Sequence, residues 1–168
     1  MMREKLIKFV LGLAQVAIDL GIVATFFTAF ATVIAGICCL VSPRTFLGGH
    51  LTINLVIQGL VVVIVAALAF AGLLATHRLL DNLNRGHYFV AANCQALQQL
   101  LWLEIAGLII SGITTIWLRL VQVKPFVSFI VMTEDNFSDG IGFIVFLLII
   151  YLIFKRGIAL QQDADNII

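Results

Sequence analysis

The sequence predicts an all-α fold, in which four transmembrane helices form an integral membrane bundle with both termini in the cytoplasm. Three observations lead to this prediction. Of the 168 residues, 62% are hydrophobic and only 11% are charged, whereas a soluble domain carries about 25% charged residues. The apolar residues form four long blocks with polar stretches between them. Lys and Arg are concentrated on one side of the topology that these blocks define.

The first apolar block, Leu6–Val41, is the longest. A helix needs about 20 apolar residues to cross the hydrocarbon core of a bilayer. The basic start of this block and the sequence Ala29-Phe30-Ala31 resemble a cleaved signal peptide. However, the apolar run is far longer than the hydrophobic region of a signal peptide. We therefore interpret the block as an uncleaved membrane anchor that spans residues 9–40.

The other three blocks predict three further spans, at residues 51–77, 96–119 and 139–158. Strands of a membrane β-barrel would alternate apolar and polar residues over about ten positions. The blocks are continuous instead, and a helix satisfies its own backbone hydrogen bonds in lipid. No repeat or low-complexity linker divides the chain, so we expect one four-span domain over residues 1–168.

The basic residues orient this topology. In a four-span chain, the N-terminus, the second loop and the C-terminus lie on the same side of the membrane. Seven basic residues fall on that side: Arg3, Lys5, Lys8, Arg78, Arg85, Lys155 and Arg156. Three fall on the other side: Arg44, Arg119 and Lys124. Because cytoplasmic loops carry the excess of Lys and Arg, both termini are expected in the cytoplasm.

The last outer loop, residues 119–140, leaves two structures open. Its first half, Leu120–Val123, and its second half, Phe126–Val131, are rich in β-branched and aromatic residues, and Lys124-Pro125 separates them. This pattern favours a small hairpin at the outer surface. A continuation of the third helix up to Pro125 is equally compatible with the sequence.

Two short patterns lie on the cytoplasmic side. In the second loop, a Gly is followed by a Phe three residues later and by Asn and Leu at four-residue steps: Gly86, Phe89, Asn93 and Leu97. In the tail, a basic pair precedes three residues that complete the second pattern: Gly157, Leu160 and Asp163. Both patterns resemble a bacterial four-helix membrane family catalogued as domain of unknown function 2975. The resemblance implies a small integral membrane protein of unknown activity, for which the family offers no catalytic residues. Its members often lie beside a small helix-turn-helix regulator, which implies a regulatory pair.

The loop pattern also has a structural interpretation. Gly86 is suited to a positive φ that ends the second helix. Phe89 would then anchor the chain at the membrane interface, and Asn93 would cap the third helix. The alternative is a docking surface for a cytoplasmic partner, to which Arg78 and Arg85 would contribute charge. The sequence leaves both interpretations open.

Two carboxylates lie inside predicted spans. A charged residue at the centre of a bilayer costs roughly 3 kcal/mol or more, so Asp19 and Glu104 are candidate functional residues. Gln15 shares a helical face with Asp19, and Ser111 and Thr115 share one with Glu104. We expect both carboxylates to point into the bundle, because lipid offers no polar partner.

Three roles remain possible for these carboxylates. The first is a structural seam, in which each carboxylate is neutral or paired with a cytoplasmic basic residue: Arg78, Arg85, Lys155 or Arg156. The second is a proton or cation relay in a small transporter. The third is an interaction site for another membrane protein.

The sequence excludes several functional classes. A net charge of +1 is too low for direct nucleic-acid binding. The three cysteines have no metal-site spacing, and His77 and His87 fall at the membrane edge rather than inside the bundle as haem ligands would. We therefore expect no cofactor and no catalytic residue.

We accordingly expect a multi-pass protein of the cell membrane with a non-enzymatic regulatory or accessory role. That role would be sensing, anchoring a cytoplasmic regulator or protecting the envelope. A small oligomeric ion-coupled transporter that uses Asp19 and Glu104 is the alternative, and a membrane anchor subunit of an enzyme complex is a third reading. The expected partners are the lipid bilayer and one of three proteins: a helix-turn-helix regulator, another membrane protein or a second copy of this chain.

Overall fold

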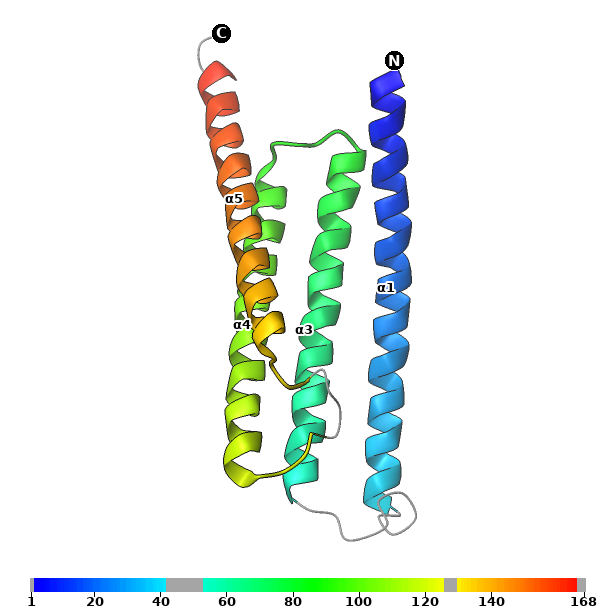
Figure 1. Cartoon of the computed structure of the whole chain (residues 1–168). Coiled ribbons are helices and arrows are strands. Elements are labelled where there is room, and N and C mark those ends of the chain that lie inside the picture. The colour runs from blue at the N-terminus through cyan, green and yellow to red at the C-terminus, as the bar shows by residue number, and fades with distance from the viewer. Residues whose placement is uncertain (1, 42–52, 126–129, 166–168) are drawn as a thin grey trace.

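A computed structural model describes residues 2–41, 53–125 and 130–165, which form four long helices (Figure 1). These helices are α1 (Met2–Val41), α3 (Ile53–Asn84), α4 (Ala91–Val121) and α5 (Glu134–Asp165). They run alternately up and down. The start of α1, the end of α5 and the α3–α4 loop lie at one end of the molecule, which we call the terminal end (Figure 1).

Each of the four helices contains a stretch that is long and apolar enough to cross a membrane: Phe9–Ala31, Ile53–Asn84, Ala91–Val121 and Glu134–Ala164. The predicted all-helical fold with four such helices is therefore confirmed. Each helix is longer than its predicted span. Apolar composition marks where lipid contact would end, whereas helical hydrogen bonding continues through polar residues until a residue terminates it.

Three of the helices share a core. Ala75 of α3, Leu97 and Leu100 of α4, and Leu147 of α5 are buried together at the terminal half of the molecule. Close packing of these side chains joins α3, α4 and α5 as a unit through van der Waals contacts.

Helix α1 lies outside this unit. Among the described residues its backbone packs against α3 alone, and it contributes no buried side chain to either core cluster. Gly21 lies at the contact, where an added Cβ atom would touch the Leu73 side chain at 3.4 Å. The rest of α1 exposes large apolar side chains such as Phe9, Leu13 and Phe26. The four helices therefore form a three-helix unit with one peripheral helix.

The start of the α4–α5 connection is neither a strand of the predicted hairpin nor a continuation of the helix to Pro125. Helix α4 ends at Val121, and Gln122 adopts a left-handed conformation with φ of 55°. The Val123 N–H donates to the Leu118 carbonyl at 3.2 Å, which closes the end of the helix. A continuation of α4 to Pro125 is therefore wrong. No strand is present among the described residues of this connection, and residues 126–129 of the predicted hairpin lie outside them.

After the gap, the chain is folded back against the bundle. Ile130 is fully buried in a cluster with Val62 and Leu118. The Met132 N–H donates to Thr115 Oγ1 at 2.7 Å. Thr115 precedes the end of α4 by six residues, or about 9 Å at 1.5 Å per residue. Helix α5 therefore begins beside the interior of α4 rather than beside its end (Figure 1).

Candidate functional site

The α3–α4 loop at the terminal end begins with a glycine turn. Gly86 has a φ of +80°, as the sequence predicts. Its N–H donates to the Leu83 carbonyl at 3.0 Å, and the His87 N–H donates to the Asn82 carbonyl at 2.9 Å. These two bonds form a Schellman motif, which needs a left-handed residue that glycine adopts without strain. The turn fixes the direction in which residues 87–90 leave α3.

Asn93 holds this loop from within. It is fully buried, and its Nδ2 donates to the His87 carbonyl at 2.8 Å and to the Tyr88 carbonyl at 2.7 Å. Its Oδ1 accepts from Asn82 Nδ2 at 2.8 Å. The expectation that Asn93 caps α4 is wrong, because Val90 is the N-cap residue and has no side-chain cap bond. Asn93 lies inside the helix and bonds the loop and α3 instead.

The two sequence patterns meet in space. The Phe89 ring lies against Gly157, where an added Cβ atom would overlap the ring. The same ring is 5.8 Å from the Phe154 ring, centroid to centroid. Leu97, the last residue of the loop pattern, is in the shared core of α3, α4 and α5. Gly157 therefore allows the loop to approach α5 closely.

The rest of the tail pattern does not join this contact. Helix α5 continues to Asp165, and Leu160 on it is 61% exposed. Asp163 is exposed as well. On the loop side, Arg78 is exposed, and Arg85 pairs with Asp81 at 2.9 Å. The terminal end thus presents an apolar side chain and charges of both signs, which we call the terminal surface: Arg78, Arg85, Leu160 and Asp163.

The carboxylate of Asp19 lies at the contact between α1 and α3. Its Oδ1 is 2.9 Å from His77 Nδ1, and Gln15 Nε2 is 3.1 Å from the same nitrogen. Asn84 Nδ2 donates to Gln15 Oε1 at 3.0 Å. We call Gln15, Asp19, His77 and Asn84 the α1–α3 polar cluster. Asp19 therefore has a polar neighbour, but that neighbour is His77 and none of the four basic residues proposed for it, and the Asp19 side chain remains 52% exposed.

Glu104 lies elsewhere, between α4 and the start of α5. It lines a pocket of about 200 Å³, together with Ser111 and Asn136. Among the described residues, no hydrogen bond or ion pair reaches its carboxylate. Thr115 does not line this pocket; its hydroxyl donates to the Ser111 carbonyl at 2.8 Å. Asp19 and Glu104 consequently do not share a cavity.

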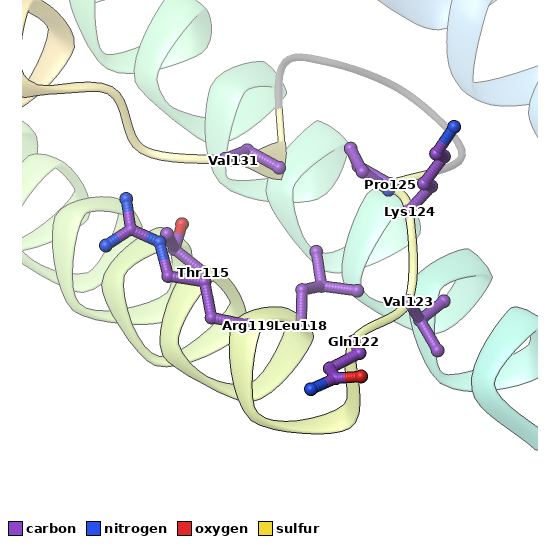
Figure 2. Close-up of a pocket in the computed structure, with 8 residues that line it drawn as sticks. All are labelled: Thr115, Leu118, Arg119, Gln122, Val123, Lys124, Pro125 and Val131. Carbon is purple, nitrogen blue, oxygen red and sulfur yellow. The ribbon is translucent and has the colours of Figure 1, made fainter.

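A second pocket, of about 300 Å³, is shown in Figure 2. It lies at the end of α4, which is opposite the termini in Figure 1. It is lined by the end of α4 and the first part of the α4–α5 connection: Thr115, Leu118, Arg119, Gln122, Val123, Lys124, Pro125 and Val131. The charged ends of Arg119 and Lys124 lie on opposite sides of it (Figure 2). The two cations therefore do not converge on one ligand position.

No group of three His, Cys, Asp or Glu side chains that could hold a metal ion is present in the part of the chain that the structure describes.

The polar contacts that the sequence did not predict are those of His77, Asn82 and Asn84. The contact of His77 with Asp19 could have been predicted from the positions of the two residues along their helices. Asp19 precedes the end of α1 by 22 residues, and His77 follows the start of α3 by 24, so antiparallel packing places them at one level.

These observations define an all-helical protein whose four helices are each long and apolar enough to cross a bilayer. The chain belongs to the family described as protein of unknown function DUF2975, whose sequence model matches residues 50–168. This match confirms the resemblance and covers α3, α4 and α5, whereas α1 precedes it. No curated protein and no solved structure matches the chain.

Proposed function

We propose that the protein is a multi-pass protein of the cell membrane with a non-enzymatic regulatory or accessory role. In this proposal both termini are cytoplasmic, and the terminal surface binds a cytoplasmic partner such as a small helix-turn-helix regulator. One observation supports it above the others: Phe89 on Gly157 fixes the loop against α5, while residues 159–164 of the helix beyond this contact are exposed.

Membrane insertion is supported by the apolar surface of the helices. Phe26 and Phe27 of α1 and Phe146 of α5 are each more than half exposed. Water would make such exposure unfavourable at about 25 cal/mol per Å², whereas lipid chains would cover it without that cost. The excess of Lys and Arg at the terminal end supports the cytoplasmic orientation.

Cysteine labelling of intact cells tests the orientation. In a chain without its natural cysteines, we expect Asp135→Cys to react with a membrane-impermeant maleimide and Asp163→Cys to react only after the membrane is permeabilised. Both positions are exposed, so accessibility within the protein is matched. Labelling of Asp163→Cys in intact cells, with Asp135→Cys protected, would reverse the proposed orientation.

The exposure of the tail supports a docking role over a packing role. Gly157 and Ile158 are partly buried, whereas residues 159–164 are exposed. Exposed side chains contribute little to stability, so removal of residues 160–168 should leave the helix bundle intact. Leu160, an exposed apolar side chain between charged ones, is the type of residue that forms the centre of a protein–protein contact.

We expect truncation after Ala159 to leave a stable, membrane-inserted protein that no longer retains its cytoplasmic partner. The measurement compares thermal stability in detergent and the proteins that copurify from native membranes, before and after truncation. Leu160→Asp is the matched single change and should have the same two effects. If truncation lowers the thermal midpoint and leaves copurification unchanged, the tail has a packing role and the proposal fails. Copurification of an enzyme would instead indicate an anchor subunit.

The pocket at Glu104 supports a second candidate function, a small ion-coupled transporter. Glu104, whose carboxylate has no hydrogen-bond or ion-pair partner among the described residues, lines this pocket together with Ser111 and Asn136. Because Asp19 is on another face, such a transporter would depend on Glu104 alone. Glu104→Gln would then abolish ion flux into liposomes, whereas truncation after Ala159 would not. The regulatory proposal requires the opposite pattern of effects.

A further inference from the structure

We infer that the α1–α3 polar cluster is a proton-binding site, and that a proton on His77 determines how α1 is bonded to the rest of the molecule. The inference rests on two distances. His77 Nδ1 lies 2.9 Å from Asp19 Oδ1 and 3.1 Å from Gln15 Nε2. A carboxylate oxygen accepts hydrogen bonds, whereas an amide nitrogen only donates them.

One ring nitrogen cannot bond to both neighbours at once. When Nδ1 carries a hydrogen, it donates to Asp19 and cannot accept from Gln15. When Nδ1 carries none, it accepts from Gln15 and has nothing to donate to Asp19. The two short distances therefore describe a site with two alternative bonding states, and the position of one hydrogen selects between them.

Proton uptake removes one of these states. A neutral imidazole carries its hydrogen on either nitrogen, so both bonding states are available to it. An imidazolium carries hydrogen on both nitrogens, so the bond from Gln15 is lost and the bond to Asp19 becomes an ion pair between two charged groups. Protonation of the ring thus replaces a bond from a neutral amide by an ion pair between α3 and α1.

Asp19 is the charged group that pairs with the imidazolium. On α3 itself, Arg78 is the next residue in the chain, and Asp81 lies one turn further on. Asp81 is held by Arg85 at 2.9 Å, so its charge is already compensated. Helix α4 packs against α3 through the core around Ala75, and its carboxylate, Glu104, lines the pocket with α5.

The location of the cluster gives the proton a mechanical consequence. Within the described structure α1 packs against α3 alone, so this contact sets how firmly α1 is held. The bond from Asn84 to Gln15 Oε1 is available in both protonation states, because it does not involve the ring. The difference between the states is the bond at His77 Nδ1. Proton binding should therefore strengthen the attachment of α1 to the three-helix unit.

Thermal unfolding of the full-length protein in detergent tests the site. We compare the unfolding midpoint of the wild type with that of His77→Gln at two pH values. The difference in favour of the wild type should grow by about 2–4 °C when the pH is lowered from about 8 to about 5.5. Asp19→Asn should lose the same increment, because the imidazolium then has no carboxylate. His87→Gln is the matched control, since His87 is exposed and no hydrogen bond or ion pair reaches its ring among the described residues. It should keep the wild-type response.

A second measurement does not depend on the stability of a variant. In the wild type with ¹⁵N-labelled histidine, the His77 signals should show hydrogen on both ring nitrogens at acidic pH, with Nδ1–H hydrogen-bonded. Assignment uses the signal that disappears in His77→Gln. A His77 ring that stays neutral at about pH 5.5 would overturn the inference. An identical pH response of the wild type and His77→Gln in thermal unfolding would overturn it equally.

Discussion

Replacing Asn93 by Ala should lower the free energy of unfolding by about 2–4 kcal/mol, because the side chain is fully buried and makes three hydrogen bonds. The change leaves the amide of Asn82 and two loop carbonyls without their partner. We expect the loss in the thermal midpoint of the protein in detergent. The loop should also become more accessible, which limited proteolysis near Tyr88 would detect.

The control for this prediction lies on the same helix. Gln95 is exposed two residues further on, and Gln95→Ala makes a comparable truncation where no described bond is lost. Its midpoint should stay close to that of the wild type. Equal midpoints for Asn93→Ala and the wild type would show that water replaces Asn93 without cost, and the loop would then not depend on this side chain.

Gly157→Ala should destabilise the protein by about 1–3 kcal/mol, although alanine is the better helix former. The added Cβ atom would overlap the Phe89 ring, so the ring must leave its position beside Phe154. We expect a lower thermal midpoint and weaker retention of the proposed cytoplasmic partner, because Leu160 and Asp163 lie on the helix that this contact holds against the loop.

Gly142 provides a matched control on the same helix, since a Cβ atom added there meets nothing within 4 Å. Gly142→Ala should therefore raise stability slightly, by about 0.5–1 kcal/mol. In a Phe89→Ala background, Gly157→Ala should behave like Gly142→Ala, because the obstructing ring is gone. A Gly157→Ala effect that is the same with and without the Phe89 ring would contradict the proposed contact.

The sequence predicts the helices well and their ends poorly. Four apolar blocks longer than a globular helix requires leave few alternatives, so the existence of each helix follows from composition. The ends depend on tertiary contacts. Helix α3 extends past the predicted limit at His77 to Asn84, because Leu79 packs in the core and the polar residues beyond it bond to α1 and α4.

Some residues of the candidate site could be predicted from the sequence and others could not. Gly86 could be predicted because one backbone conformation at the end of a helix favours one residue type. Asn93 could not, since the same side chain serves as a cap at a helix start and as an internal donor one turn later. The contact of Phe89 with Gly157 joins residues far apart in the chain, and neither residue type specifies it.

The start of α5 beside the interior of α4 has a consequence for the thickness of the lipid around this helix. Its uncharged stretch runs from Gly140 to Phe154, roughly 22 Å at 1.5 Å per residue, against a hydrocarbon core of about 30 Å. In the proposed membrane orientation, acyl chains beside α5 must shorten or tilt, while those beside α1 need not. Such a mismatch costs fractions of a kcal/mol per Å, which is enough to make a protein sensitive to bilayer thickness. The annulus of lipid around this molecule would therefore be thin on the side of α5 and of normal thickness on the side of α1.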